Sequence, residues 1–197
     1  PAMARPAVAV IDIGKTNAKL LLVDLSSGAE TTVARRANQV RTDGPYPSFD
    51  IEGLWIFLLA ALTDLAHSQR VDAISITTHG AAAVLVDGVG DLVLPMLDYE
   101  HSGPDETAPD YDALRPAFAS SGTPRLPGGL NLGAQLFWQS RKFPDAFART
   151  RHILTYPQYW AHRLTGVAAS EATSLGCHTD LWQPYEGVFS PMVNALG

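Results

Sequence analysis

The stretch VAVIDIGKTNAKLLLVDLSSGAE, residues 8–30, decides the fold of this 197-residue chain. It contains Gly14, Lys15 and Thr16, the last three letters of a nucleotide-binding P-loop. A P-loop also needs a glycine five residues before the Gly-Lys pair, where Ala9 stands, and a helix after the threonine. The segment that follows is instead short, apolar and β-prone, and it ends at the turn former SSG. The stretch therefore predicts a tight turn between two strands and not a P-loop.

Outward from this stretch, the first half of the chain has the pattern of an α/β fold that begins with a hairpin. A helix is predicted over residues 48–69, because its apolar residues follow helical spacing and Asp50 is suited to be its N-cap. Three strands precede this helix, which differs from the alternating order of a Rossmann domain and predicts a mixed sheet. The predicted strands are 7–13 (buried on both faces), 19–25, 30–37 and 71–80 (also buried).

The second half is less regular. Residues 101–111 are rich in turn formers and predict a surface loop. Residues 169–184 are polar and predict a partly extended segment. The other predicted elements are a hairpin or strand pair over 82–97, helices around 110–119 and 133–142, a strand and then a helix ending at Gly166, and the start of a helix at 190–197.

Composition narrows the class of protein. The net charge of −6 argues against a general nucleic-acid-binding surface. Cys177 is the single cysteine, which excludes an internal disulfide framework and suits a reducing cytoplasm. No apolar run is expected to reach membrane-spanning length. We therefore expect a cytoplasmic protein that binds neither nucleic acid nor a membrane.

The turn after the first strand gathers polar residues that suit a phosphate group. Asp12 ends a buried strand, where one carboxylate could hold hydrated Mg²⁺. Successive N–H groups in such a turn form an anion-binding concavity, and nearby lysines add positive charge. The alternative is a solvated turn with a capping aspartate and surface lysines. The residues concerned are Asp12, Gly14, Lys15, Thr16, Asn17 and Lys19.

The motif DIGKTNAK resembles the first phosphate motif of the sugar kinase, Hsp70 and actin superfamily. Two further stretches, residues 74–100 and 129–174, follow in the order seen in the N-terminal part of the FGGY carbohydrate kinases, so the likeness spans nearly the whole chain. The resemblance implies an α/β fold of the ribonuclease H-like (actin-like ATPase) type, with a mixed sheet flanked by helices. It also implies that residues 1–197 are an N-terminal domain, incomplete at its C-terminal end, whose second domain is absent.

The resemblance assigns roles to individual residues. Lys15 departs from the threonine or alanine more usual at its position. Without the resemblance, the favoured interpretation of His79 is a core histidine that holds a backbone carbonyl, and that of Glu100 is an ordinary loop acid. Asp98 could also be an ordinary loop acid. The implied roles are a metal site at Asp12, ATP phosphate binding by Gly14, Lys15, Thr16, Asn17 and Lys19, and sugar binding by His79, Gly80, Asp98 and Glu100.

The activity that the resemblance implies is transfer of the γ-phosphoryl group of ATP, with Mg²⁺, to a hydroxyl of a ketose or polyol. The segment LGCHTDLW is similar to the kinases of deoxy-ketoses such as L-rhamnulose and L-fuculose, and xylulose is a further candidate. The catalytic aspartate of the family lies downstream, so no catalytic residue is assigned in this chain. The expected partner is a small sugar, homodimerisation is left open, and the alternative is a non-catalytic ATP-binding regulator of the same superfamily.

Overall fold

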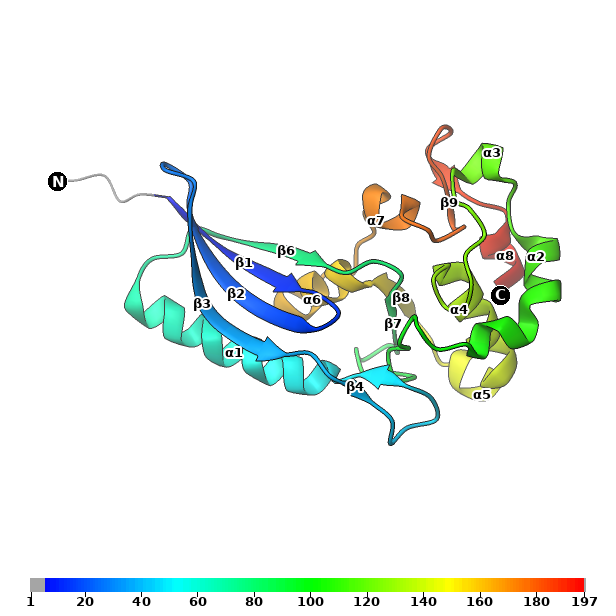
Figure 1. Ribbon diagram of the computed structural model, residues 1–197, viewed down its shortest axis with the longest axis horizontal. Helices are drawn as coiled ribbons and strands as arrows, with labels where there is room; N and C mark the ends of the chain where they lie inside the picture. The colour runs from blue at the N-terminus through cyan, green and yellow to red at the C-terminus, as the bar shows by residue number, and fades with distance from the viewer. Residues whose placement is uncertain (1–5, 197) are drawn as a thin grey trace. The chain divides into compact units, whose positions relative to one another are not determined.

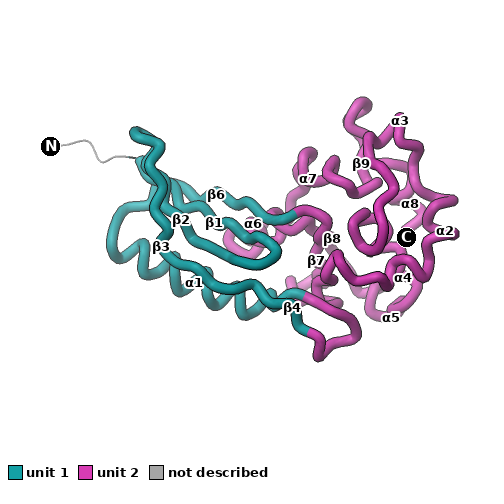
Figure 2. Tube along the Cα trace, in the orientation of Figure 1, with its two compact units in different colours: residues 1–41, 49–79 teal, residues 42–48, 80–197 magenta. Residues whose placement is uncertain are grey.

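The structure, a computed structural model, describes residues 6–196 and divides into two compact units, coloured separately in Figure 2. Unit 1 contains the chain up to residue 41 and residues 49–79. Unit 2 contains residues 42–48 and the chain from residue 80 onward.

Unit 1 is built on a four-stranded mixed sheet with the order β3-β2-β1-β6 (Figure 1). β1 pairs antiparallel with β2 and parallel with β6, and β2 pairs antiparallel with β3. This is the mixed sheet that three strands before a helix predicted. The strands are β1 (Ala7–Ile13), β2 (Asn17–Asp24), β3 (Ala29–Ala37) and β6 (Ala73–Thr78).

Burial in the sheet differs from what the apolar runs predicted. In β1, Ala9, Ile11 and Ile13 are buried, but the residues between them are only partly buried, so the strand is not buried on both faces. α1 lies against β2 and β3 and covers one face of the sheet. β6 is mostly exposed, with Ile74 44% accessible, because it forms an edge of the sheet. The sequence therefore predicted a strand within residues 71–80 correctly, but the prediction that this strand is buried is wrong.

Helix α1 (Ile51–Ser68) begins at the predicted N-cap. The Asp50 carboxylate accepts a hydrogen bond from the Gly53 N–H at 3.1 Å and pairs with Arg36 Nη2 at 2.5 Å. Among residues 6–196, α1 alone is long and apolar enough, by length and composition, to cross a membrane, which the sequence analysis did not expect. Core helices of soluble proteins can have the same length and composition.

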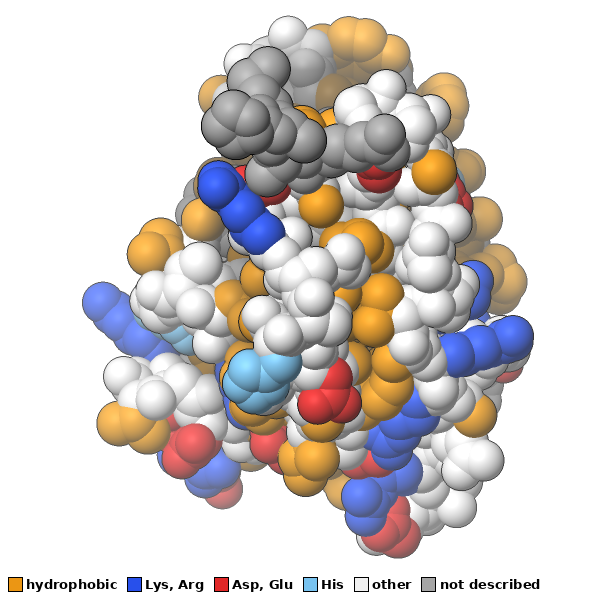
Figure 3. Space-filling model, turned by 90° about the vertical axis from the view of Figure 1, so that its left-hand side faces the viewer, with side chains coloured by type: hydrophobic (Ala, Val, Ile, Leu, Met, Phe, Trp, Pro, Cys, Tyr) orange, Lys and Arg blue, Asp and Glu red, His pale blue; other side chains and the backbone are white. Residues whose placement is uncertain are grey.

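The end of unit 1 near the start of β6 carries an apolar groove of about 390 Å³. Figure 3 views this end of the molecule, where hydrophobic side chains reach the surface among polar and charged ones. The groove is lined by Leu62, Ala66, Val71, Asp72, Ala73 and Ile74.

Two short strands, β4 (Val40–Arg41) and β5 (Ser48–Phe49), lie on either side of the 42–47 loop.

Unit 2 is mainly helical. Its longest strands, β7 (Ala83–Val86) and β8 (His152–Thr155), pair antiparallel, and β9 (Trp182–Gln183) pairs with β10 (Val188–Phe189). α6 ends at Gly166, as predicted, where φ is +75°. The helices are η1 (Gly103–Thr107), α2 (Ala108–Leu114), α3 (Phe118–Ser121), α4 (Leu132–Lys142), α5 (Pro144–Phe147), α6 (Tyr156–Thr165), α7 (Ala172–Gly176) and α8 (Met192–Leu196).

Several predictions for this half are corrected. The supposed loop 101–111 forms η1 and the start of α2. The helix expected at 110–119 breaks at Arg115, which is extended because the residue before a proline avoids helical ψ. The segment 169–184 contains α7, whose first turn is capped by the carboxylate of Glu171.

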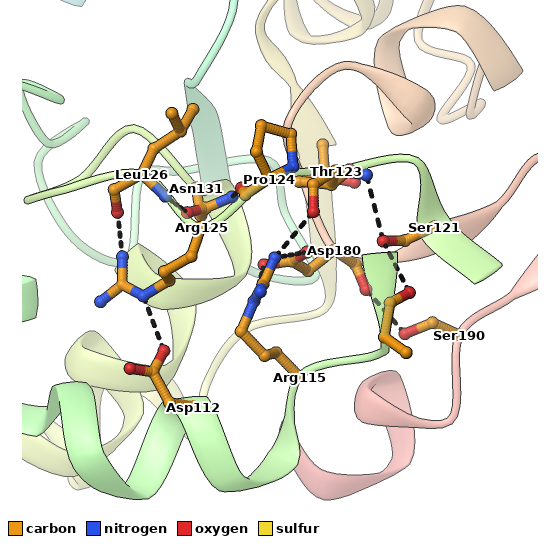
Figure 4. A network of polar contacts seen from close by, with 12 residues as sticks. Asp112, Arg115, Ser121, Thr123, Pro124, Arg125, Leu126, Asn131, Asp180 and Ser190 are labelled. Carbon is orange, nitrogen blue, oxygen red and sulfur yellow. Dashed lines mark hydrogen bonds and ion pairs between the residues drawn. The ribbon is translucent and has the colours of Figure 1, made fainter. Parts of the chain in front are cut away.

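A buried polar network lies inside unit 2 (Figure 4). Asp180 is fully buried, and Arg115 bonds both of its carboxylate oxygens, at 3.0 and 3.2 Å. Tyr111 donates its hydroxyl to the same carboxylate. Burial raises the pKa of Tyr111, and the negative charge of Asp180 raises it further, so the phenol stays protonated. A buried carboxylate is tolerated here because it is fully paired.

Candidate active site

The carboxyl-terminal ends of β1 and β6 lie side by side, because the two strands are parallel neighbours (Figure 1). They belong to the edge of the unit 1 sheet that is formed by strand ends. Asp12 is next to last in β1. His79 follows β6, and its backbone N–H donates to the Ile13 carbonyl at 2.8 Å. The sheet therefore brings the candidate metal residue and one candidate sugar residue to the same edge, where ligands of α/β sheets commonly bind.

The predicted phosphate turn is a tight connection between β1 and β2. The Gly14 N–H donates to the Asn17 carbonyl at 2.8 Å, which closes the turn. The Asn17 side chain donates to the Thr16 hydroxyl at 3.0 Å and accepts from Arg35 Nε at 3.0 Å. A hairpin-like turn between strands is what the sequence predicted in place of a P-loop.

Asp12 and Lys19 face each other across β1 and β2. Their side chains form an ion pair, Nζ to Oδ2, at 3.6 Å, and each is 36% exposed. A pair as exposed as this contributes little to stability. Its effect is to hold the carboxylate at the strand end beside a positive charge.

Phe49 lies between two candidate residues, and the sequence analysis did not single it out. The Lys15 ammonium is 5.7 Å from the centre of its ring, within the range of a cation–π contact. The His79 ring centroid lies 5.0 Å from it. An apolar residue just before a helix N-cap is usually assigned to packing on the helix, so Phe49 carried no functional signal.

Asn38 is a second residue that the sequence analysis missed. It follows β3 and is 7% exposed. Its backbone N–H and its side-chain amide donate to the carbonyls of Thr16 and Gly14, respectively. Nothing in the spacing of the sequence connects residue 38 to the turn. The end of β3 lies beside the turn only because β3 pairs with β2 in the sheet.

The remaining predicted sugar residues belong to unit 2. Gly80 lies beside Cys177, since a Cβ on Gly80 would be 3.5 Å from the cysteine sulfur. The next residue, Ala81, has φ of +53°, a strained backbone for alanine that is often found at functional sites. Gln135 Nε2 donates to the Ala81 carbonyl at 2.7 Å and holds this turn.

Asp98 and Glu100 lie in one short turn. Asp98 is 6% exposed, and its Oδ1 accepts the Glu100 N–H at 3.2 Å. The Glu100 side chain is exposed. The structure thus joins these two residues to each other, and Asp98 has a clear structural task in the turn.

A metal held only by protein side chains has no candidate in the described chain. Within residues 6–196, no group of three or more His, Cys, Asp or Glu side chains could hold a metal ion. Mg²⁺ commonly takes one or two carboxylates and completes its shell with water and phosphate oxygens. The lone carboxylate of Asp12 fits that kind of site.

Comparison with known proteins agrees with this geometry. Residues 7–193 match the model of the N-terminal domain of the FGGY family of carbohydrate kinases. A carbohydrate kinase from Novosphingobium aromaticivorans is 39% identical over 99% of this chain, with a TM-score of 0.85. Xylulose kinase and gluconate kinase from Lactobacillus acidophilus have TM-scores of 0.83 and 0.82 at 14% and 15% identity, over 97% and 98% of this chain.

These neighbours confirm the expected fold class, a mixed sheet with helices of the ribonuclease H-like, actin-like ATPase type. At 14% and 15% identity, the two Lactobacillus enzymes show the fold alone. The chain spans 41% of the Novosphingobium protein and 40% of each Lactobacillus enzyme. It corresponds to less than half of a protein of that size.

Proposed function

Because the chain belongs to the FGGY family of carbohydrate kinases, we propose that the protein of which it is a part transfers the γ-phosphoryl group of ATP to a hydroxyl of a ketose or polyol. The candidate substrates are L-rhamnulose and L-fuculose, on the likeness of the LGCHTDLW segment, and xylulose. This chain supplies the first phosphate turn and part of the sugar pocket. The catalytic base comes from outside it.

The turn from Gly14 to Asn17 is the observation that carries the proposal. Gly14 does not adopt a left-handed φ, and a Cβ there would meet only the Asn17 carbonyl, at an ordinary contact distance of 3.5 Å. The fold of the described chain therefore does not require glycine at this position. Close approach of a phosphate to the turn backbone does supply a reason for it.

Charged side chains around the turn have separate tasks in this proposal. Asp12 would hold Mg²⁺, directly or through water, and Lys19 keeps the Asp12 carboxylate at the strand end. When bound, the ion neutralises charge on the ATP phosphates. Lys15 adds a positive charge whose position is steadied by the Phe49 ring.

The sugar is proposed to lie against His79, Gly80, Asp98 and Glu100. Two observations support this assignment. His79 shares the sheet edge with the phosphate turn, and Ala81, beside Gly80, is held in a strained conformation by Gln135. Such strain is often retained where a turn shapes a binding pocket.

The test is a panel assay on the full-length protein. Release of ADP is followed with ATP, Mg²⁺ and, in turn, L-rhamnulose, L-fuculose, xylulose, gluconate and glycerol. Sugar-dependent turnover is expected with at least one ketose or polyol. Asp12→Ala should abolish it, because the site loses the carboxylate that is proposed to hold Mg²⁺.

Asp24→Asn is the matched control, because it removes a carboxylate from the opposite end of β2. It should keep wild-type turnover. Normal kcat in the Asp12→Ala variant would remove Asp12 from the metal site. Binding of nucleotide without phosphorylation of any sugar would favour the non-catalytic regulator instead.

A further inference from the structure

We infer that Asn38 is a positioning residue for nucleotide binding, which orients two peptide groups of the phosphate turn so that their N–H groups face the phosphates. The inference rests on the proposed function. It concerns a residue on a different strand from the turn, and it makes a prediction about nucleotide affinity that is separate from sugar recognition.

Asn38 holds the turn through two hydrogen bonds. Its Nδ2 donates to the Gly14 carbonyl at 2.9 Å, and its backbone N–H donates to the Thr16 carbonyl at 3.0 Å. The register brings it there, because Ala37, the last residue of β3, pairs with Asn17 at the start of β2. Asn38 is 7% exposed, and its side-chain bond to Gly14 is partly buried.

These two bonds set the direction of the turn's amides. In a planar trans peptide the N–H points away from the C=O of the same unit. When the Gly14 carbonyl is held toward Asn38, the Lys15 N–H points to the opposite side. The same holds for the Thr16 carbonyl and the Asn17 N–H. Amides aligned in this way form an anion-binding concavity.

The orientation of the Asn38 side chain has a single sensible assignment. If the amide were reversed, its oxygen would face the Gly14 carbonyl oxygen, and two acceptors would meet. In the orientation found, Oδ1 is buried and makes no hydrogen bond within residues 6–196. A buried acceptor without a hydrogen bond lowers the stability of the protein. The bond from Asn38 Nδ2 to the Gly14 carbonyl gives a reason for an asparagine at this position in spite of that cost.

The experiment measures kinetics and nucleotide binding in the full-length protein. For Asn38→Ala, the KM for MgATP and the calorimetric Kd for MgADP should both rise about ten-fold, because the Gly14 carbonyl loses its side-chain donor and the Lys15 N–H loses its fixed direction. The backbone bond to the Thr16 carbonyl stays. The KM for the sugar should change less than about two-fold, since no bond to the sugar residues is altered.

Two further variants give a signature that a purely structural role would not produce. Asn38→Asp keeps the shape but replaces the donor with a negative acceptor facing the Gly14 carbonyl. Asn38→Ser keeps a hydroxyl that can donate. The KM for MgATP should therefore rise more in Asn38→Asp than in Asn38→Ser. If Asn38→Ala does not fold, this comparison still tests the inference.

Asn131→Ala is the matched control. Asn131 is also buried, and its side chain makes two bonds to backbone groups, from Leu126 N–H at 2.8 Å and to the Pro124 carbonyl at 3.1 Å (Figure 4). This variant should lower Tm and leave the KM for MgATP unchanged.

The outcomes separate the inference from the proposed function. Wild-type nucleotide constants in the Asn38 variants of an active enzyme, or a loss of Tm alone as in the control, would overturn the inference. If the wild-type protein binds MgADP but phosphorylates no sugar, the proposed function fails, and the Kd for MgADP in the variants still decides the role of Asn38. A wild-type protein that binds no nucleotide would overturn both.

Discussion

Single side chains at the candidate site are held by partners from other strands. Asp12 pairs with Lys19 on β2, and Arg35 on β3 bonds the side chain of Asn17. Both pairs depend on the register of the sheet, since a shift by one residue would turn the partners to opposite faces. The charges of the site are therefore ordered by the sheet before any ligand binds.

The side chains that are proposed to contact the sugar lead to a prediction about the affinity for the sugar. His79→Ala and Asp98→Asn should each weaken sugar binding in the full-length protein by about 1–3 kcal/mol, because a substrate hydroxyl loses its partner. The affinity for MgATP should stay near the wild-type value. Asp98→Asn keeps an acceptor for the Glu100 N–H, so it tests charge and not the turn.

Calorimetry with sugar and with nucleotide separates the two effects. His67→Ala, at the exposed C-terminal end of α1, is the control and should change neither affinity. Unchanged sugar affinity in both test variants would return His79 to a core role and Asp98 to the turn.

Asp50 joins helix capping to an ion pair. Its carboxylate accepts from the Gly53 N–H and lies near Arg36 and Arg41, at 2.5 and 3.7 Å. Burial alone would raise the pKa of Asp50. The hydrogen bonds from Arg36 and Gly53 and the charges of both arginines outweigh burial, so the pKa is lowered from its ordinary value of 3.8.

A lowered pKa makes the contribution of Asp50 to stability depend on pH. The contribution is complete above the ordinary pKa of 3.8 and is lost as the pH falls through the lowered value. Asp50→Asn, which keeps a capping oxygen, should destabilise the protein by about 1 kcal/mol at pH 7. The difference from wild type should shrink below about pH 4, as acid protonates the carboxylate.

Denaturant unfolding between pH 7 and pH 3 measures this difference. Asp64→Asn removes an exposed carboxylate from the same helix and should have no effect. A difference between Asp50→Asn and wild type that stays constant over the whole range would show that the charge of Asp50 does not contribute.

Helix α4 illustrates how one element depends on a distant segment. The N–H groups of Leu132 and Gly133 donate to the carbonyls of His178 and Thr179, which satisfies two donors that a helix start leaves unpaired. The approach is close. A Cβ on Gly133 would lie 2.8 Å from the Thr179 carbonyl oxygen and 2.4 Å from Met192 Cε.

Gly133→Ala should therefore destabilise the protein by about 1–3 kcal/mol, although alanine is the better helix former, because the backbone at Thr179 must move. Thermal unfolding measures the effect. Gly176→Ala, at the end of α7, is the matched control. Its Cβ would have nothing closer than Trp182 at 3.9 Å, so this variant should be neutral or slightly stabilising. Equal Tm values for the two variants would contradict the packing at Gly133.

The chain spans 41% of the length of the Novosphingobium kinase. Phosphoryl transfer depends on positioning two substrates and excluding water. The described residues supply one candidate phosphate turn at a sheet edge and a set of candidate sugar contacts. No catalytic base is assigned among them.

We expect residues 1–197 alone to phosphorylate no sugar. The reaction needs a base within hydrogen-bond reach of the attacking hydroxyl, and no residue of this chain is assigned as that base. The assay is ADP release from the purified fragment with the same sugar panel, and the full-length protein is the positive control. The fragment should stay at the level of the enzyme-free blank. Turnover at ordinary kinase rates would place the base inside this sequence and overturn the assignment of the site.

Local patterns determined much of unit 1. The apolar runs on either side of the Gly14 turn predicted β1 and β2, and the segment after the SSG turn predicted β3, each to within two residues at either end. Asp50 marked the start of α1. These features are encoded by neighbours in the sequence: alternation or apolarity in a strand, helical spacing, and a cap. The mixed character of the sheet followed as well, because three strands before the first helix differ from the alternating order of a Rossmann domain.

Tertiary structure alone decided burial and the supporting residues of the site. β6 is exposed because of its place at the edge of the sheet, which its apolar sequence does not reveal. Asn38 and Phe49 contact the turn from Gly14 to Asn17 only when β3 and β5 fold against it. A sequence pattern records which residues suit a strand, a cap or a turn, whereas contacts between residues more than twenty positions apart depend on the register and packing of the whole unit.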